Sequence, residues 1–322
     1  MKAAVYYQTG APDVFKYEDV DDPQCFASGV VIEVKAISVE GGDVLNRAQG
    51  EMPSRPHIVG YQCAGVIKEA GASVSDRQPG QRVVAIMPFG SHAELVGVSA
   101  MQTWPVPDGM DLAEAACVPI PFGTADDCLF ELGRLQKGES VLIQAGAGGV
   151  GMAAIQLAKQ AGATVLATAS SDEKLERLKE FGLDHGINYT REDFPSRAKE
   201  ITGGRGVNLV VDSVGTTLNG SIQALAYRGR VVSVGNAGRA EERLLDITQL
   251  SERNLTFTGA FFGGSMMMEP QRARAVVQKH IDAVAAGKLH VVIDRIFPLA
   301  EAASAHEYRE SRQAFGRVVL TP

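Results

Sequence analysis

The chain has 322 residues and a formal net charge of −7, and 45% of its residues are hydrophobic. This length allows two domains with separate hydrophobic cores, and the acidic balance with dispersed arginines argues against nucleic acid as a main partner. No apolar run approaches the ~18 residues that span a bilayer, and the start MKAAVYYQTG has no signal-peptide core, so we expect a cytoplasmic protein without a membrane partner.

The first part of the chain, residues 1–118, contains short strand-like runs separated by glycine and proline. These runs are KAAVYY, VVIEVKAIS, AGVIKEAG, RVVAIM and HAELVGV. Short runs rich in β-branched residues between turn residues are typical of strands. We therefore predict a mainly β domain for residues 1–118.

A glycine-rich motif follows this region. Residues 141–151 read VLIQAGAGGVG, in which three glycines have the G-x-G-x-x-G spacing between an apolar run and an amphipathic stretch. In a dinucleotide-binding turn the first glycine permits the bend, the second allows a pyrophosphate to approach the backbone, and the third permits close packing of helix and strand. A glycine-rich turn that serves packing alone is the alternative. The motif predicts that cofactor phosphates bind at Gly146, Ala147, Gly148, Gly149, Val150 and Gly151.

Strand-like and helix-like segments alternate after the motif. Such alternation predicts crossover units and a parallel sheet covered on both faces. We assign residues 119–262 to this dinucleotide-binding domain, and we expect residues 263–322 to return to the first domain. The strand-like segments are 163–170, 185–189, 206–215 and 229–235, and the helix-like segments are 172–182, 194–202 and 218–226.

The cysteines and histidines show no ligand pattern. The 4 cysteines lack C-x-x-C and metal-type spacing, so we expect them to be reduced and mostly buried. The 6 histidines are expected on surfaces or at helix caps. The residues concerned are Cys25, Cys63, Cys117, Cys128, His57, His92, His185, His280, His290 and His306.

The chain carries a series of motifs whose order resembles that of the zinc-independent quinone oxidoreductases, the zeta-crystallin-like members of the medium-chain dehydrogenase/reductase superfamily. The resemblance extends over essentially the whole chain. It implies an α/β protein with a GroES-like, mainly β catalytic domain, a Rossmann domain with a doubly wound parallel sheet, and an active cleft between them. The motifs are VVIEVKAIS, GGDVLNRAQG, PHIVGYQCAGVI, GQRVVA, HAELV, AGAGGVG, INY, VVDSVG, VVSVGNAG and FGRVVL.

The resemblance also addresses metal binding. Zinc-using relatives place a cysteine before the G-D segment and a His-Glu pair in the later motif, where this chain has Glu40, Tyr61 and Gln62. A catalytic zinc needs three cysteine, histidine or carboxylate ligands, and only Glu40 could serve. The four-cysteine lobe that such relatives carry after GQRVV is also missing. We therefore predict no metal.

The end of the second strand of the nucleotide domain bears on the choice of cofactor. Asp or Glu there favours NAD, whereas hydroxyl and cationic groups accommodate the 2′-phosphate of NADP. This chain has Ser170, Ser171 and Lys174, and in the family pattern Tyr189 also lines the phosphate site. We therefore predict NADPH, although the acidic pair before Lys174 favours NAD. A capping box between Ser170 and Glu173 is an alternative role that does not exclude a phosphate site.

Further cofactor contacts follow from the resemblance alone. Thr124 in FGTAD matches the threonine that packs beside the nicotinamide, and Asn236 in VGNAG matches a nucleotide-side asparagine. Phe262 falls in the loop that borders the nicotinamide, and the methionines at 266–268 could form a wall of the cleft. Ordinary turn or packing roles are the alternative for each residue, and a lid is a further alternative for the methionines.

Candidate catalytic groups lie near the positions where relatives bind zinc. Tyr61 is the first candidate for donating a proton to an enolate, Glu40 is another if burial keeps it protonated, and water is a third. A structural role is the alternative for Tyr61. Asp43 and Arg47, four residues apart, predict a local ion pair, and a substrate contact by Arg47 is the second interpretation. Glu40 and Leu45 stand where quinone reductases carry Asn and Tyr, which leaves quinone specificity open.

The sequence therefore predicts an NADPH-dependent, metal-free reductase of small-molecule quinones or α,β-unsaturated carbonyl compounds. Such acceptors can take hydride without zinc because the charge delocalises onto oxygen. A 2-enoyl thioester reductase is the alternative enzyme, and a crystallin-like, NADPH-binding or structural protein with incidental turnover is the alternative from another class. The segment LTFTGA is suitable for edge-strand pairing, so we expect a homodimer.

Overall fold

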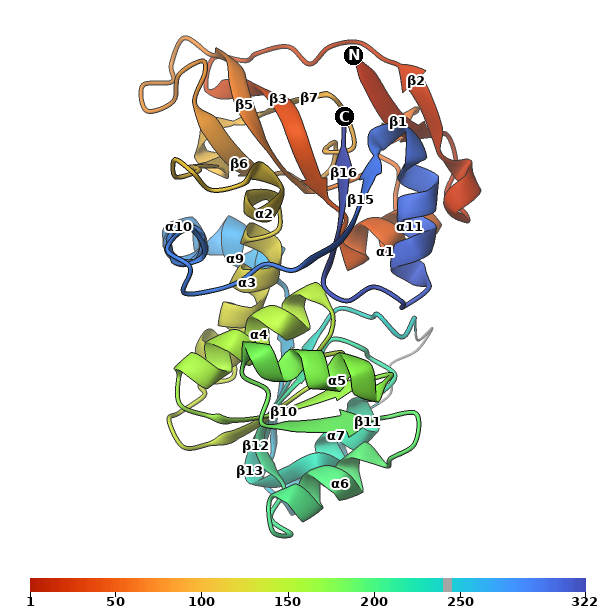
Figure 1. Ribbon diagram of the computed structural model, residues 1–322, viewed down its shortest axis with the longest axis vertical. Coiled ribbons are helices and arrows are strands. Elements are labelled where there is room, and N and C mark those ends of the chain that lie inside the picture. Colours follow the sequence, from red (N-terminus) through yellow and green to blue (C-terminus); the bar gives the residue numbers. More distant parts are fainter. Residues whose placement is uncertain (240–244) are drawn as a thin grey trace. The chain divides into compact units, whose positions relative to one another are not determined.

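The computed structural model describes residues 1–239 and 245–322. The chain divides into two compact units, and Figure 1 traces both. Unit 1 contains Met1–Ile120 and Val277–Pro322, and unit 2 contains Pro121–Val276. The C-terminal segment thus joins unit 1 at Val277, whereas the sequence placed this return at residue 263.

Unit 1 is built around two sheets. The larger sheet has 7 strands in the order β15-β16-β3-β5-β6-β8, with β7 also paired to β3, and the smaller has the order β2-β1-β4. Every strand-like run predicted for residues 1–118 lies on a strand. The strands are β1 (Lys2–Tyr6), β2 (Lys16–Asp19), β3 (Gly29–Ser38), β4 (His57–Ile58), β5 (Gln62–Ala70), β6 (Arg82–Ile86), β7 (Leu95–Ser99), β8 (Thr103–Pro105), β15 (Ile293–Pro298) and β16 (Arg317–Thr321).

The core of unit 1 lies along β3. This strand pairs antiparallel with β5, β7 and β16, and most of its aliphatic side chains are buried. Aliphatic residues of β16 and small residues of α11 join the same hydrophobic cluster. The C-terminal segment therefore completes the core of unit 1. The helices of this unit are α1 (Gly41–Gln49), α2 (Leu112–Ala116) and α11 (Ala302–Glu310).

Unit 2 contains a parallel sheet of 6 strands in the order β11-β10-β9-β12-β13-β14. The first strand in the chain, β9, is central, and later strands are added first on one side and then on the other. This is the doubly wound order of a dinucleotide-binding fold, which confirms the predicted α/β class. The strands are β9 (Ser140–Ile143), β10 (Thr164–Ala169), β11 (His185–Asn188), β12 (Val207–Asp212), β13 (Leu225–Val234) and β14 (Thr256–Ala260).

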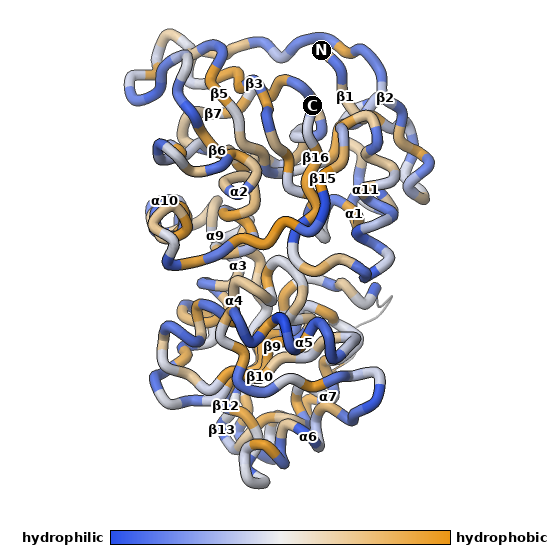
Figure 2. Tube along the Cα trace, in the orientation of Figure 1, coloured by the Kyte–Doolittle hydropathy of each residue, from blue (hydrophilic) through white to orange (hydrophobic). Residues whose placement is uncertain are grey.

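Hydropathy follows the layers of unit 2. Figure 2 shows hydrophobic residues along the central strands and a hydrophilic α5. Helices in crossover connections need only one apolar side, whereas the central strands are buried on both faces. The helices are α4 (Gly149–Gln160), α5 (Asp172–Leu178), α6 (Phe194–Ile201), α7 (Leu218–Ala224), α8 (Ile247–Glu252) and α9 (Phe262–Met268); α3 (Pro119–Asp126) and α10 (Pro270–Ala285) each include residues of both units.

Contacts of α9 and the start of α10 account for the later boundary of unit 2. Phe262 packs so closely on Gly123 that a Cβ there would come 2.3 Å from its ring. Asp127 accepts hydrogen bonds from Ser265 at 2.5 Å and from Arg272 at 2.7 Å. These contacts join α9 and the start of α10 to α3 and to Asp127, which directly follows it.

The histidine prediction is wrong for four of the side chains. His57, His92, His280 and His306 are buried, whereas His185 is exposed. His92 and His306 share a hydrogen bond of 3.1 Å between their Nε2 atoms, which requires one ring to donate and the other to accept. Tertiary packing therefore overrides the polarity of these residues.

The cysteine prediction is confirmed. All four thiols are free, Cys25 is partly exposed, and Cys63, Cys117 and Cys128 are buried.

Over residues 1–239 and 245–322, no helix combines the length and apolar content needed to cross a membrane.

Candidate functional site

The glycine motif forms a tight turn between β9 and α4. Ala145 adopts the left-handed φ of 53° immediately before the first glycine. A Cβ at Gly146 would come 2.9 Å from the Cβ of Ala167 on β10, and one at Gly151 would come 2.4 Å from the Ala145 carbonyl oxygen. A Cβ at Gly148 would meet only that oxygen, at 3.3 Å. The first and third glycines therefore permit the packing, as the motif predicts, and the second lies in a more open position.

The turn leaves backbone donors at the N-terminus of α4. Gly148 is the N-cap and has no side chain to bond the first N–H groups. Within the described residues, no group accepts a hydrogen bond from the N–H of Gly149, Val150 or Gly151. Unpaired N–H groups and the positive end of a helix dipole together attract phosphate. The turn thus fits a pyrophosphate as well as serving the packing of α4.

The predicted 2′-phosphate residues gather after β10. Ser171 caps α5, because its Oγ accepts a hydrogen bond of 3.3 Å from the Lys174 N–H. The predicted capping box between Ser170 and Glu173 is therefore wrong by one residue, and Ser170 lies between the strand and the cap.

Strand β11 brings Tyr189 to the same edge of the sheet. Ala169 and Asn188 are register partners, and the Tyr189 N–H donates to the Ala169 carbonyl at 3.2 Å. Tyr189 is exposed and directly follows β11, as Ser170 directly follows β10. The structure thus brings the predicted serines and tyrosine together at the carboxyl ends of adjacent parallel strands.

The remaining predicted cofactor residues also belong to unit 2. Asn236 follows β13, so it lies at the same carboxyl edge as the glycine turn after β9. Thr124 is buried on α3, one residue after the glycine that Phe262 contacts. The cofactor roles of these three residues stay predictions.

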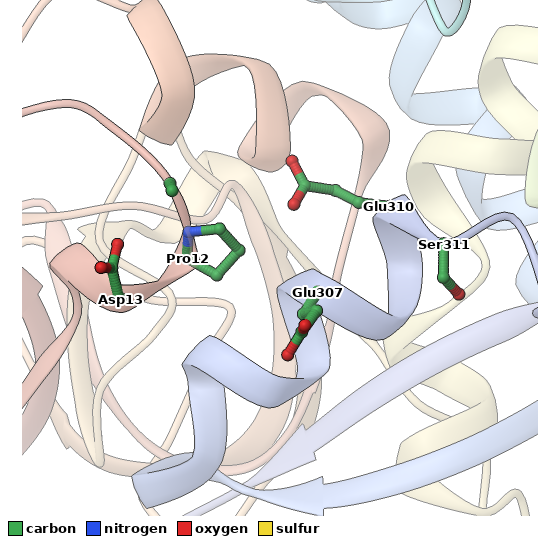
Figure 3. Close-up of a pocket in the computed structure, with 6 residues that line it drawn as sticks. Pro12, Asp13, Glu307, Glu310 and Ser311 are labelled. Atoms are coloured by element: carbon green, nitrogen blue, oxygen red, sulfur yellow. The ribbon is translucent and has the colours of Figure 1, made fainter.

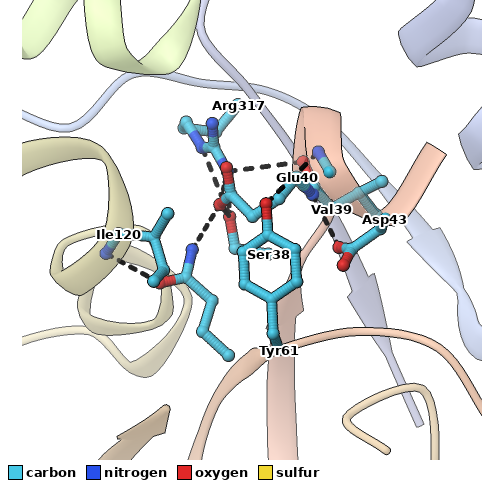
Figure 4. A network of polar contacts seen from close by, with 9 residues as sticks. Ser38, Val39, Glu40, Asp43, Tyr61, Ile120 and Arg317 are labelled. Atoms are coloured by element: carbon cyan, nitrogen blue, oxygen red, sulfur yellow. Dashed lines mark hydrogen bonds and ion pairs between the residues drawn. The ribbon is translucent and has the colours of Figure 1, made fainter. Parts of the chain in front are cut away.

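A buried polar cluster in unit 1 contains Glu40. Glu40 lies between β3 and α1, and one of its oxygens accepts hydrogen bonds from Ser38 at 3.1 Å and from the Gln62 amide. The same oxygen forms an ion pair with Arg317 on β16 (Figure 4). Arg317 also donates to Ser38 at 2.5 Å, and Gln62 accepts from the Ile120 N–H at 3.1 Å. Side chains from distant parts of the sequence therefore enclose this carboxylate.

Electrostatics keep Arg317 charged in this cluster. Burial acts to lower the pKa of the Arg317 guanidinium, but Glu40, Cys117 and Tyr61 together outweigh it, and the pKa is raised. Burial also raises the pKa of the adjacent Cys117 thiol. Arg317 is absent from the residues predicted from the sequence, because a lone arginine in the closing FGRVVL motif carries no local signal that it pairs with a residue near position 40.

The residues at the positions where zinc-using relatives carry their ligands do not fit zinc. Glu40 is already neutralised by Arg317, while Gln62 contributes an amide that is hydrogen bonded on both sides. A catalytic zinc requires three anionic or imidazole ligands with open lone pairs. The described residues also contain no cluster of three or more His, Cys, Asp or Glu side chains that could hold a metal ion.

Tyr61 lies beside this cluster with its hydroxyl over the start of α1. Its oxygen accepts a hydrogen bond of 3.2 Å from the Gly42 N–H, and a Cβ at Gly42 would come 2.6 Å from that oxygen. Burial, followed by the negative charges of Asp43 and Glu40, raises the pKa of the phenol well above its ordinary value. The phenol therefore stays protonated at neutral pH and can donate its own proton.

The predicted ion pair between Asp43 and Arg47 is wrong. Arg47 is 1% exposed and pairs instead with Glu310 on α11, at 2.6 Å. Asp43 accepts a hydrogen bond of 2.8 Å from the Glu40 N–H, and burial raises its pKa well above the ordinary value. Helical spacing suggested the nearest partner, but the packing of α11 on α1 supplied a different one. The burial of Arg47 does not favour the predicted substrate contact.

A hollow of about 520 Å³ lies on unit 1 beside the ion pair of Arg47. Figure 3 shows its acidic lining, which comes from the segment before β2 and from α11. None of the predicted site residues lines it. The lining residues are Ala11, Pro12, Asp13, Glu307, Glu310 and Ser311.

Comparisons with known proteins cover both units. A family model described as the alcohol dehydrogenase GroES-like domain matches residues 27–108, and one described as zinc-binding dehydrogenase matches residues 149–282. A 2-haloacrylate reductase from Burkholderia sp is 34% identical over 99% of this chain and 98% of the relative. The structure of Escherichia coli quinone oxidoreductase complexed with NADPH has a TM-score of 0.94 and 28% identity, with 100% of both chains covered.

A further relative is a much longer protein. A phenolphthiocerol/phthiocerol polyketide synthase from Mycobacterium tuberculosis is 32% identical over 99% of this chain. The chain spans 15% of the length of that relative. The match therefore concerns one part of a large synthase.

Proposed function

The chain belongs to the quinone oxidoreductases of the medium-chain dehydrogenase/reductase superfamily, and from this premise we propose that it is an NADPH-dependent reductase of quinones or α,β-unsaturated carbonyl compounds. The observation that carries the proposal is the arrangement of groups at the carboxyl ends of the parallel strands in unit 2. There the N–H groups at the start of α4, which have no acceptor in the part of the chain that the structure describes, lie at the carboxyl ends of the strands, as do the serines and the tyrosine after β10 and β11.

The residues of unit 2 fit NADPH. Gly148 and the N–H groups of Gly149 and Val150 would hold the pyrophosphate, while Ser170 and Tyr189 would border the 2′-phosphate. When bound, NADPH supplies the hydride. The protein contributes orientation of the cofactor and stabilisation of the charge that develops on the substrate oxygen.

In unit 1, Tyr61 is the proposed proton donor. Its oxygen is held by the Gly42 N–H, and the phenol is protonated at neutral pH, so that its proton is available to an enolate. Glu40 does not suit this role, because its carboxylate is paired with the Arg317 guanidinium. The buried ion pair instead fixes the chain between β3 and α1, just before Gly42, whose N–H holds the tyrosine.

Two acceptor classes fit this chemistry. The 2-haloacrylate that gives the Burkholderia relative its name is an alkene conjugated to a carboxylate, and the Escherichia coli neighbour is named for quinones. In both classes the charge left by hydride addition delocalises onto oxygen. Neither class therefore requires a metal ion.

The first test is NADPH oxidation by chelator-treated protein with a panel of quinones and 2-enones, run beside NADH. We expect turnover that survives chelation and prefers NADPH. The preferred acceptor would distinguish quinone from alkene reduction. Tight binding of NADPH without turnover of any acceptor, or activity that only zinc restores, would contradict the proposal.

Variants of unit 1 test the tyrosine. Tyr61→Phe should lower kcat with an alkene acceptor about 100-fold while the Kd for NADPH is unchanged, since general acids contribute at least that much. Gly42→Ala should lower kcat as well, because the new Cβ displaces the phenol. Gly41→Ala is the matched control, since a Cβ at Gly41 has no neighbour within 4 Å. Equal kcat values for Tyr61→Phe and wild type would assign the proton to water.

The polyketide synthase relative favours a second candidate, a 2-enoyl thioester reductase. Such an enzyme would reduce an alkene conjugated to a thioester carbonyl by the same chemistry. A comparison of crotonyl-CoA with the corresponding simple enone decides between them. A kcat/KM at least tenfold higher for the thioester would favour this candidate.

We also propose a homodimer. Strand β14, which contains most of the LTFTGA segment, is an edge strand of the sheet in unit 2, and an exposed edge can pair with a second copy across a two-fold axis. Light scattering should give twice the chain mass. A monomer at micromolar concentration would exclude this arrangement.

A further inference from the structure

We propose that Arg191 determines the preference for NADPH by binding its 2′-phosphate, and that Asp172 holds Arg191 in the free protein and competes with the phosphate for it. This inference rests on the proposed function, because it concerns the cofactor site of unit 2. It adds two residues to the serines, lysine and tyrosine predicted from the sequence.

The contacts of Asp172 carry the first step. Asp172 is the first residue of α5. One of its carboxylate oxygens accepts a hydrogen bond of 2.9 Å from the Asn188 side chain, and the other forms an ion pair with Arg191. Both partners belong to β11 or to the turn that follows it. The carboxylate is therefore bound to the neighbouring strand.

Asn188 fixes the position of the Asp172 carboxylate relative to Arg191. It is buried at the end of β11, and its side-chain oxygen accepts hydrogen bonds from the Thr190 hydroxyl at 2.7 Å and the Thr190 N–H at 3.1 Å. The Arg191 N–H donates to the Asn188 carbonyl at 3.1 Å, which closes the turn. The amide that orients Asp172 is thus fixed by the same turn that presents Arg191.

Asp172 lies where an acidic residue affects the choice between NAD and NADP. An acidic residue after the second strand of a dinucleotide-binding domain favours NAD by bonding the ribose hydroxyl and repelling a phosphate. Asp172 stands two residues after Ser170, but its charge is balanced by Arg191. The acidic residue that favoured NAD in the sequence is thus paired with a guanidinium at the start of α5, which Ser171 caps.

Arg191 suits a phosphate in charge and geometry. Its side chain is 63% exposed, so a ligand can reach the guanidinium without displacing the core. Guanidinium groups bind phosphate oxygens in pairs, and a 2′-phosphate carries more negative charge than one carboxylate. The phosphate therefore takes Arg191 from Asp172 when NADPH binds, whereas NADH leaves the ion pair intact.

The test measures the Kd of full-length protein by titration calorimetry for NADPH, NADH and adenosine 2′,5′-bisphosphate. Arg191→Gln should weaken NADPH and the bisphosphate about tenfold and leave NADH unchanged, as expected for loss of a charged hydrogen bond. Asp172→Asn should tighten NADPH roughly threefold, the scale of an exposed ion pair. Arg205→Gln is the control, because it removes an exposed arginine before β12, at the amino ends of the strands. It should change none of the three Kd values.

The outcomes separate this inference from the proposed function. If the wild-type protein binds neither nucleotide, the proposed function fails and the role of Arg191 fails with it. If it binds NADPH and Arg191→Gln keeps the wild-type ratio of the NADPH and NADH Kd values, only the role of Arg191 is overturned. If Asp172→Asn weakens NADPH as Arg191→Gln does, Asp172 positions the arginine and the proposed competition is wrong.

Discussion

The glycine turn of unit 2 and the polar cluster of unit 1 are built in opposite ways. The turn is made by consecutive residues at 145–151, and its donors are backbone N–H groups. The cluster assembles Ser38, Glu40, Gln62 and Arg317 from segments far apart in the chain, and its contacts are made by side chains. A site made from local backbone can be recognised from its spacing, whereas a site made from long-range side-chain contacts cannot.

The two regions also differ in what a substitution removes. The turn depends on atoms that are absent, because a Cβ at Gly146 or Gly151 would overlap neighbouring atoms. The cluster depends on a charge pair in which Glu40 and Arg317 are only 3% and 4% exposed. A buried charge without its partner is more costly than an overpacked turn. Unit 1 is therefore expected to be the more sensitive region.

The largest expected effect is that of Arg317→Met, which leaves Glu40 buried without its counter-charge. We expect the free energy of unfolding to fall by about 3–5 kcal/mol, measured by urea denaturation. The double variant Glu40→Gln/Arg317→Met is the control and should recover most of the loss, because no charge remains buried. If the double variant is as unstable as the single one, the loss reflects packing and the two regions differ less than proposed.

A smaller effect is expected in the glycine turn. Gly151→Ala should lower the free energy of unfolding by about 2 kcal/mol, because its Cβ would press against the Ala145 carbonyl oxygen. Gly148→Ala, in the more open position, should keep most of the stability but weaken NADPH binding, since its Cβ would occupy the approach of the pyrophosphate. Equal stability of the two alanine variants would show that the turn can relax, contrary to its expected rigidity.

The smallest expected effect concerns pH and distinguishes the buried histidines of unit 1 from the exposed His185 of unit 2. Burial lowers the pKa of His92 to about 3 and that of His306 well below its ordinary value. The unfolded chain therefore binds more protons as the pH falls below the ordinary pKa of 6.5, and stability decreases from there towards about pH 3. Between pH 7 and pH 5.5 the free energy of unfolding should fall by roughly 1 kcal/mol for His92.

Histidine variants test this assignment by urea denaturation at both pH values. His92→Gln should reduce the pH dependence, because glutamine takes up no proton in the unfolded chain. His185→Gln should leave the wild-type dependence intact, since His185 is exposed. An unchanged pH dependence in His92→Gln would rule out the buried histidine as its source.

Much of the fold could be predicted from local patterns. The strand-like runs of residues 1–118 and the alternation after Gly151 correspond to observed elements, because hydrophobic period and turn residues act over short distances. The capping of α5 was misplaced by one residue, since Ser170 and Ser171 are equally good caps in isolation. The later boundary, at Val276, depends on contacts of α9 and the start of α10 that no local pattern reveals.

By itself, the sequence determined the class of fold and the glycine turn, because both follow from spacing along the chain. The placing of Tyr189 with Ser170 at the phosphate site came from the resemblance to a known family. Only the tertiary structure decided that Arg317 neutralises Glu40, that Arg47 pairs with Glu310, and that Asp172 meets Arg191. Each of these charges has several possible partners in the sequence. For Glu40 and Arg47 packing selects one of them, since a buried charge tolerates only the partner that the surrounding elements bring within hydrogen-bond distance. The exposed Asp172 meets Arg191 because the pairing of β11 with β10 brings the turn after β11 to the start of α5.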